Sequence, residues 1–341
     1  MSTKSQMLKL LDGGKGGYLS GGVLARQLEV SRSAVWKTVE SLRSEGYIIT
    51  AVTNKGYRLE SGGDILSEAG IMSFLKTRGV FNIDVRKSVT STNIVLRELA
   101  AKGAPEWYVV AAGEQTAGKG RMGREFHSPA GNGAYFSLLL RPADRAQIRR
   151  ASFADATLIT SAASVAVARA ISEVTGIQAG IKWVNDIFVG DKKVCGILTE
   201  ATVGIESGMI ENAVLGIGIN VTKPENGYPE PLRGIAGSLA DSASGKDNER
   251  CRLIAATLDN FREIYSDLGG RGFLSEYRSR STVIGKDIFV LSGAGRKPAR
   301  AMEIDDDCRL IVRYESGEAA ALGSGEISVR PVVEQPKVQL I

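Results

Sequence analysis

Gly118-Lys119-Gly120-Arg121-Met122-Gly123-Arg124 joins two segments of this chain that have the composition of core strands. Residues 107–112 before it and 134–140 after it are apolar runs of strand length. The glycines let the backbone bend and approach a ligand closely, while the cations favour an anion. Gly/Arg-rich segments are also often flexible surface loops, so the loop by itself leaves both interpretations open.

The first sixty residues have the pattern of a winged helix-turn-helix. Short apolar helices are expected at residues 7–11 and 22–28, and Ser31 can cap a third helix over 32–44. Residues 47–52 and 56–59 then flank a three-residue turn, which predicts a hairpin as the wing.

The charge of this N-terminal unit indicates a polyanionic partner. Residues 1–60 hold nine Lys and Arg against five Asp and Glu, so most of the chain's net charge of +5 lies there. In a winged helix the third helix enters the major groove of DNA. The expected DNA contacts are the side chains at the start of that helix and at the tip of the wing: Ser31, Arg32, Ser33, Trp36, Lys37 and Lys55. A helical module that binds another protein is the alternative.

The rest of the chain predicts two further domains. With 341 residues, 43% hydrophobic and 24% charged, the chain is long enough for two or three domains. After a linker at 61–64, strands and helices alternate as in a mixed α/β domain, with a buried helix at 153–174 and a strand at 181–189. From about residue 284, short strands and turns indicate a small β-barrel. The predicted bounds are 1–61, 65–281 and 282–332.

Composition and cysteine spacing also indicate the cellular compartment of the protein and whether it holds a metal. No apolar run approaches the length of a membrane span and the N-terminus lacks a signal peptide, so we expect a cytoplasmic protein without a membrane partner. Cys195, Cys251 and Cys308 are far apart and have no metal-ligand spacing, which predicts reduced structural thiols and no protein metal site.

Three polar motifs accompany the Gly/Arg loop. Lys182-Trp183-Val184-Asn185-Asp186 falls within the predicted strand 181–189, where a buried lysine requires an anionic partner. Gly216-Ile217-Gly218-Ile219-Asn220 has small residues on one face that leave room for a flat ligand, although close strand packing also explains them. Ser91-Thr92-Asn93 opens a helix and offers hydroxyl and amide groups, although plain N-capping explains Ser91 or Thr92 equally well.

In order and spacing, these motifs resemble those of the biotin protein ligases, and the resemblance covers almost the whole chain. The family pattern also includes a glutamine before the Gly/Arg loop, a G-I-L-x-E strand and a C-terminal G-E-I-S, which stand here as Gln115, Gly196 to Glu200 and Gly325 to Ser328. With its winged helix, the chain resembles the bifunctional subclass, which is both a ligase and the repressor of the biotin operon.

The resemblance implies a catalytic domain of the biotin/lipoate ligase type, an SH3-like C-terminal barrel and a reaction in two steps. Biotin and ATP, with Mg²⁺ bound through ATP, form biotinyl-5′-AMP and pyrophosphate. The biotinyl group then passes to a lysine of the biotin carboxyl-carrier protein of acetyl-CoA carboxylase. With biotinyl-AMP bound, the protein is expected to form a homodimer on operator DNA.

The resemblance also assigns roles to residues. Lys182 and Arg121 are the expected catalytic residues. The expected biotin-binding residues are Ser91, Thr92, Asn93, Gln115, Lys119, Gly120, Arg121, Lys182, Gly216 and Gly218. The expected adenylate-binding residues are Arg121, Arg124, Lys182 and Asn220.

Departures from the family pattern keep alternatives open. Lys119 replaces the commoner arginine, Val184 replaces the usual proline, and no tryptophan follows Trp183, so an adenine-side tryptophan of some members is missing. One alternative is a ligand-sensing repressor whose ligase-like domain has no catalytic activity, which the presence of Lys182 and Arg121 disfavours. Another is a transferase for lipoate or octanoate, which the Gly/Arg loop disfavours.

Overall fold

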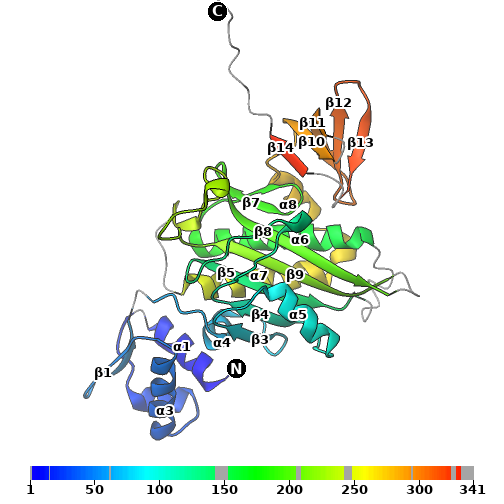
Figure 1. Cartoon of the computed structure of the whole chain (residues 1–341). Coiled ribbons are helices and arrows are strands. Elements are labelled where there is room, and N and C mark those ends of the chain that lie inside the picture. The colour runs from blue at the N-terminus through cyan, green and yellow to red at the C-terminus, as the bar shows by residue number, and fades with distance from the viewer. Residues whose placement is uncertain are drawn as a thin grey trace, which may run out of the picture.

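The N-terminal part of the chain folds as a winged helix. The computed structural model describes residues 2–14, 16–60, 63–142, 153–204, 209–241, 248–292, 295–323 and 328–331. In it, three helices precede a two-stranded antiparallel hairpin: α1 (Thr3–Gly13), α2 (Gly21–Gln27), α3 (Arg32–Ser44), β1 (Ile49–Val52) and β2 (Gly56–Leu59). Figure 1 places this unit at the blue end of the molecule, beside the central sheet.

Serine side chains set the starts of all three helices. The side chains of Ser2, Ser20 and Ser31 each accept a hydrogen bond from the backbone N–H three residues later, which satisfies an otherwise unpaired donor. Helix α1 therefore begins earlier than the apolar pattern of residues 7–11 predicted. Apolar side chains from α1, α2 and α3, including Met7, Leu24 and Val39, form the buried core of this unit.

The winged helix is attached to the central domain by specific polar contacts. Asp12 of α1 accepts two hydrogen bonds from Arg252 of the central domain, at 2.9 and 3.0 Å. The hydroxyls of Tyr47 and Ser67 are 2.8 Å apart, and Arg250 pairs with Asp64 of the linker at 2.7 Å. Two ion pairs and one hydrogen bond therefore join the two parts, and one of the ion pairs is made by the linker.

The central domain is built on a seven-stranded mixed sheet with the order β3-β4-β5-β9-β8-β7-β6. Only β3 and β4 are parallel, and every other neighbouring pair is antiparallel. The strands are β3 (Asn82–Arg86), β4 (Tyr108–Ala112), β5 (Gly133–Leu140), β6 (Gly180–Lys182), β7 (Asp186–Val189), β8 (Lys192–Val203) and β9 (Ile210–Asn220).

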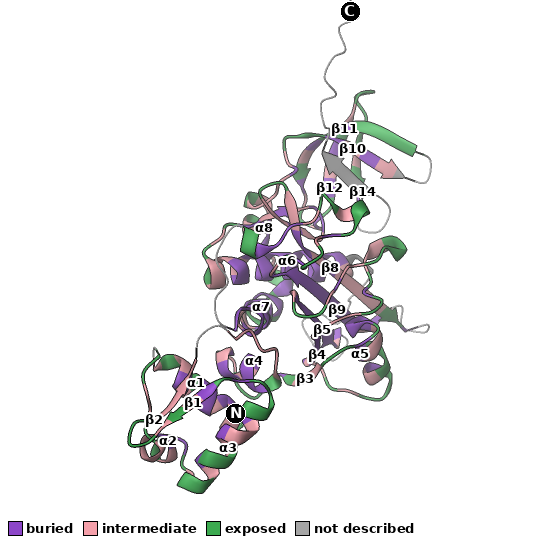
Figure 2. Ribbon diagram, turned by 60° about the vertical axis from the view of Figure 1, so that its left-hand side comes forward, coloured by how far each residue is buried: buried purple, intermediate pink, exposed green. Residues whose placement is uncertain are grey.

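Alternating side chains divide this sheet into two buried faces. Val109, Leu138 and Leu215 belong to the large core that includes α6 (Phe153–Thr175) and α7 (Glu249–Ser266). The intervening residues Val110, Leu139 and Val214 pack with Leu96 of α5 (Thr92–Ala101). Figure 2 shows the buried sheet between these helices. Both faces are covered, which explains the nearly continuous apolar sequence of β4 and β5.

Helix α6 is the central buried helix of the domain. The segment Ala156–Thr175 is long and apolar enough to cross a membrane by length and composition, but 78% of its most apolar window is buried inside the protein. The predicted helix over 153–174 is confirmed to within one residue.

The prediction of one strand over 181–189 is wrong. The chain reverses there, because β6 and β7 form an antiparallel hairpin in which Lys182 pairs with Asp186. Trp183 to Asn185 make the turn between them. Apolar Trp183 and Val184 are buried here by tertiary packing and not by a strand ladder, which is why their composition was misleading. Short α4 (Glu68–Phe74) and α8 (Leu274–Ser279), with strand β3, were not predicted.

The C-terminal part is a five-stranded antiparallel sheet, at the orange and red end in Figure 1. Its strands are β10 (Asp287–Ser292), β11 (Gly295–Ile304), β12 (Leu310–Tyr314), β13 (Ala319–Leu322) and β14 (Ser328–Pro331), in the order β13-β12-β11-β10-β14. Within the described residues no pairing joins β13 to β14, so a closed barrel is not established. Residues 325–327 of the predicted G-E-I-S motif lie outside the described residues.

Candidate active site

The sequence motifs meet around one cavity of about 700 Å³. Its floor is the α5-facing side of the sheet, because Ser137, Gly216 and Leu198 are opposite one another on β5, β9 and β8. Every expected biotin or adenylate residue except Asn220 lines this cavity: Ser91, Thr92, Asn93, Gln115, Lys119, Gly120, Arg121, Arg124, Lys182, Gly216 and Gly218. Segments more than 100 residues apart in the chain therefore converge on one ligand-sized space.

One end of the cavity carries hydroxyl and amide groups. Ser91 occupies the N-cap position of α5, but its side chain makes no capping hydrogen bond. The backbone N–H and the hydroxyl of Thr92 instead donate to Oε1 of Gln115, at 2.9 and 3.1 Å. Nε2 of Gln115 donates to Ser128 at 2.9 Å. The amide orientation of Gln115 is thus fixed from both ends, and plain N-capping does not explain Ser91.

A buried serine on strand β5 supports this end. The Ser137 hydroxyl lies 2.7 Å from Oγ1 of Thr92 and 2.6 Å from Oδ1 of Asn93. Asn93 in turn donates to Glu200 at 2.7 Å, and Glu200 pairs with Arg97 at 3.3 Å. A polar chain therefore runs from the cavity to the surface of α5. Neither Ser137 nor Glu200 was predicted as a site residue from the sequence.

The glycines of β9 make space for side chains of this chain. A Cβ atom on Gly216 would lie 2.1 Å from Oδ1 of Asn93, and one on Gly218 would lie 2.4 Å from the ring of Phe126. A Cβ on Gly196 of β8 would lie 3.1 Å from the same ring. The room expected for a flat ligand is therefore partly filled by Asn93 and Phe126, and Phe126 is a cavity residue that sequence analysis missed.

The Gly/Arg loop is folded back on itself. The N–H of Gly120 donates to the Arg124 carbonyl at 2.7 Å, and the N–H of Phe126 donates to the Gly118 carbonyl at 2.8 Å. Met122 and Gly123 both have positive φ, at 56° and 73°, and make the tight turn at the tip. Because the N–H of Gly120 is already used, the cationic side chains contribute most of the loop's attraction for an anion.

Arg121 is the most deeply placed of these cations. Its Nη1 donates to Oδ1 of Asn185 at 3.1 Å, while Nδ2 of Asn185 donates to the Ile197 carbonyl at 2.8 Å. Its Nη2 is buried and has no hydrogen-bond partner among the described residues. Burial lowers the pKa of Arg121, and the nearby Asp186 carboxylate opposes that shift. A guanidinium remains charged in either case, so this donor is available to an anion in the cavity.

Two lysines accompany Arg121 on the β6–β7–β8 side. Lys182 ends β6, with its Nζ 5.5 Å from the centroid of the Phe188 ring. Lys193 of β8 pairs with Asp186 at 2.6 Å and lines the same cavity, although the sequence analysis did not identify it. This side therefore places positive charge opposite the hydroxyl and amide end, as a ligand with one anionic end requires.

Asn220 and His127 lie outside this cavity. Asn220 is buried and donates to the Gly237 carbonyl at 3.0 Å, so it holds the segment that follows β9. His127, the chain's only histidine, lines a separate cleft with Asn132 and Tyr228. The structure thus gives Asn220 a supporting position and gives His127 no place beside Arg121 or Lys182.

The chain is similar to known bifunctional proteins over nearly its full length. A model of the Biotin/lipoate A/B protein ligase family matches residues 85–220, and an HTH domain model matches residues 3–58. The "Bifunctional ligase/repressor BirA" of Bacillus subtilis is 37% identical over 92% of this chain and 95% of that protein. Its Escherichia coli counterpart is 25% identical over 95% of this chain and 96% of that protein.

This chain belongs to the bifunctional biotin protein ligases and repressors. Among solved structures, the biotin protein ligase of Aquifex aeolicus in complex with biotin and ATP is similar, with a TM-score of 0.60 and 25% identity. The match covers 74% of this chain and 99% of that chain. Family membership agrees with the cavity, whose two ends differ in charge and polarity as the two parts of an adenylated substrate do.

The family's DNA-binding unit is present with its expected side chains exposed. Arg32, Ser33, Trp36 and Lys37 lie at the exposed start of α3, and Lys55 lies at the exposed tip of the β1–β2 hairpin. Ser31 is exposed as well, and its hydroxyl oxygen accepts from the Ala34 N–H at 3.1 Å as the cap of α3. Trp36 is 55% exposed, which is unusual for so large an apolar side chain without a partner surface.

Proposed function

We propose that this protein adenylates biotin, transfers the biotinyl group to a carrier protein and represses transcription in response to biotin. The observation that carries the proposal is the buried Arg121 guanidinium, which has an unpartnered Nη2 beside the same cavity as Lys182 and the Gln115–Thr92 pair. Family membership supports both the ligase and the repressor activities. The structure supplies side chains suited to each end of a biotinyl adenylate.

In the first step, a carboxylate oxygen of biotin attacks the α-phosphorus of ATP. The bond from that phosphorus to the bridging oxygen breaks, and pyrophosphate leaves. Carboxylate and triphosphate repel each other, so cations must lie between them, a role that suits Lys182 and Arg121. Arg124 extends the positive charge at the cavity mouth.

Mg²⁺ would enter with the triphosphate. Mg²⁺ is usually bound through substrate phosphates and water, which would supply most of its ligands here. Among the described residues no group of three or more His, Cys, Asp or Glu is placed to hold a metal. When bound, Mg²⁺ would offset part of the triphosphate charge.

In the second step, the amine of a carrier lysine attacks the carbonyl carbon of the mixed anhydride. The bond from that carbon to the phosphate oxygen breaks, AMP leaves, and the new amide nitrogen loses a proton to solvent. No covalent enzyme intermediate is required. We assign the hydroxyl and amide end, with Ser91, Asn93 and Gln115, to the biotin ring, and Gly216 and Gly218 to the wall beside it.

The proposal also names the partners of the protein. The carrier is the biotin carboxyl-carrier protein of acetyl-CoA carboxylase, and the DNA partner is a biotin operator. When carrier is scarce, the biotinyl-AMP form accumulates and binds that operator as a homodimer. We place the domain bounds at 1–61, 65–281 and 282–332, and we assign the C-terminal sheet to an SH3-like barrel.

The ligase activity is tested by mass spectrometry of a carrier domain. Incubated with the protein, biotin, ATP and Mg²⁺, the carrier should gain the mass of one biotinyl group. Adding lipoate in excess should not suppress the gain. An unchanged carrier mass would instead identify a non-catalytic, ligand-sensing repressor.

A further inference from the structure

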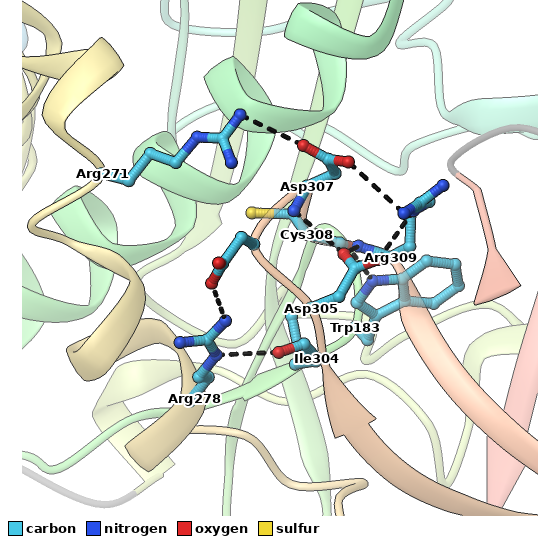
Figure 3. A network of polar contacts seen from close by, with 9 residues as sticks. Trp183, Arg271, Arg278, Ile304, Asp305, Asp307, Cys308 and Arg309 are labelled. Carbon is cyan, nitrogen blue, oxygen red and sulfur yellow. Dashed lines mark hydrogen bonds and ion pairs between the residues drawn. The ribbon is translucent and has the colours of Figure 1, made fainter.

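The C-terminal sheet contacts the Lys182–Asp186 motif through one buried hydrogen bond. Nε1 of Trp183 donates to the backbone carbonyl of Cys308 at 2.8 Å. Trp183 is 5% exposed and Cys308 is fully buried, so water does not compete for this bond. Figure 3 shows the indole pointing at the turn that joins β11 to β12.

This turn, residues 305–309, is rigid by its own hydrogen bonds. Oδ1 of Asp305 accepts from the backbone N–H groups of Asp307 and Arg309, at 3.0 and 2.8 Å. The N–H of Cys308 donates to the Asp305 carbonyl at 3.1 Å. Cys308 has a φ of 59°, a left-handed conformation that few side chains adopt without support. The direction of the Cys308 carbonyl is therefore fixed by the turn.

The central domain holds the same turn from outside. Arg278 of α8 donates to the Ile304 carbonyl at 2.8 Å and to Asp306 at 2.7 Å. Arg271, just before α8, donates to Asp307 at 3.1 Å. The two ion pairs are partly exposed, but with the bond to Ile304 they join the turn and the end of β11 to α8 and to the segment just before it (Figure 3).

Helix α8 also holds the motif itself. The hydroxyl of Tyr277 donates to the Val184 carbonyl at 3.1 Å, and Ser164 of α6 reaches the same carbonyl at 3.3 Å. The turn between β6 and β7 is thus fixed at Trp183 by the C-terminal sheet and at Val184 by the helices. On either side of these two anchored residues are Lys182 and Asn185, and Asn185 holds Arg121.

We propose that the 305–309 turn is a positioning element for adenylation, which acts through Trp183 on Lys182 and Asn185. Trp183 lines the cavity, but its indole N–H is bound to the Cys308 carbonyl, and Arg278 does not line the cavity, so we class both as positioning residues. The inference rests on the proposed ligase function. It implies that the contact with the C-terminal sheet is needed for the full rate of adenylation, in addition to any contribution of this sheet to stability.

The test compares Trp183→Phe and Arg278→Met with Arg300→Met. Trp183→Phe removes the indole donor, and Arg278→Met releases the turn from α8. Arg300→Met is the matched control, because it breaks an exposed ion pair with Asp287 on the same sheet, away from the turn. For each full-length protein we would measure thermal unfolding, biotin affinity, and kcat and KM for pyrophosphate release from biotin and ATP.

Both test variants should stay folded and bind biotin as the unchanged protein does, while kcat for pyrophosphate release falls about ten- to a hundredfold, as displaced catalytic groups predict. Arg300→Met should keep the full kcat. A normal kcat in folded Arg278→Met and Trp183→Phe would overturn the proposal, as would equal losses of kcat and biotin affinity. Should Trp183→Phe not fold, Arg278→Met alone decides between these results. If the unchanged protein releases no pyrophosphate, the ligase function itself fails.

Discussion

Arg121 and Asn185 are joined by a hydrogen bond of 3.1 Å that orients the guanidinium and leaves its Nη2 buried without a partner among the described residues. A buried donor without an acceptor costs free energy unless a ligand supplies one. The unliganded protein therefore already holds a buried donor that is oriented to bind an anion.

Replacing Arg121 with glycine should loosen the intermediate. Loss of charged hydrogen bonds to the anhydride phosphate should cost about 1.5–3 kcal/mol of binding free energy. Biotinyl-AMP should then escape and label lysines of bystander proteins, which mass spectrometry of an added unrelated protein would detect. Retention equal to that of the unchanged protein would exclude Arg121 as the group that holds the phosphate.

Asn185→Asp should weaken adenylate binding by a different route. The new carboxylate would pair with the Arg121 guanidinium and neutralise the positive charge that would otherwise bind the phosphate of the ligand. Calorimetry should show weaker binding of biotinyl-AMP, while biotin alone binds nearly as before. If biotin and biotinyl-AMP lose affinity equally, Asn185 supports the whole cavity and does not act through Arg121.

Ser137→Ala should reduce biotin affinity from beneath the cavity. Its removal leaves Oδ1 of Asn93 and the Thr92 hydroxyl without this buried partner, which raises the free energy of the folded protein by about 1–3 kcal/mol. The control is Ser73→Ala, since Ser73 is also buried but bonds only the Gly70 carbonyl in its own helix. Calorimetry with biotin should separate the two variants, and equal affinities would remove Ser137 from the site.

DNA binding should depend on the exposed cations of the winged helix. Lys37→Ala and Lys55→Ala should each weaken binding and reduce the slope of log K against log salt by about 0.9 for every phosphate that the protein no longer neutralises. Lys102→Ala, an exposed lysine just after α5, should leave the slope unchanged. A slope equally unaffected by all three changes would place the DNA elsewhere.

The cysteines should be inert in the folded protein. All three are free and buried, and burial raises the pKa of the Cys308 thiol to about 11 and that of Cys251 to about 12. Burial disfavours the thiolate, so at neutral pH these groups stay protonated and unreactive. Alkylation should be slow in buffer and complete in denaturant, and rapid labelling of the native protein would contradict this burial.

The sequence predicted correctly those elements that are stabilised by residues close to one another in the chain. The winged helix was predicted correctly because Ser31 caps the third helix and the apolar residues have helical spacing. The prediction of a single strand over 181–189 was wrong because the turn within this segment is stabilised by residues that are distant in the sequence. The partners of Trp183 and Val184 are Cys308 and Tyr277, which lie 125 and 93 residues away. No window of sequence contains those contacts.

The same division applies to the site. The motifs shared with the biotin protein ligases predicted Gln115, Arg121, Lys182 and Gly216 as site residues, and the structure brings them together around one cavity. The same motifs did not predict Ser137, Glu200 or Lys193 as site residues, because the contacts of a single polar residue in a strand become known only from the fold. Asn220 shows the opposite case, since its place in a motif did not reveal that its amide is bound to Gly237.

By itself, the sequence determined the order of the domains, the family and the central polar residues of the cavity, because these follow from local pattern and from motifs shared with the family. Only the tertiary structure decided the hairpin at Lys182, the buried polar chain through Ser137, and the contact from Cys308 to Trp183. Each of these depends on hydrogen bonds between segments far apart in the chain, whose geometry exists only after the sheet and helices have packed.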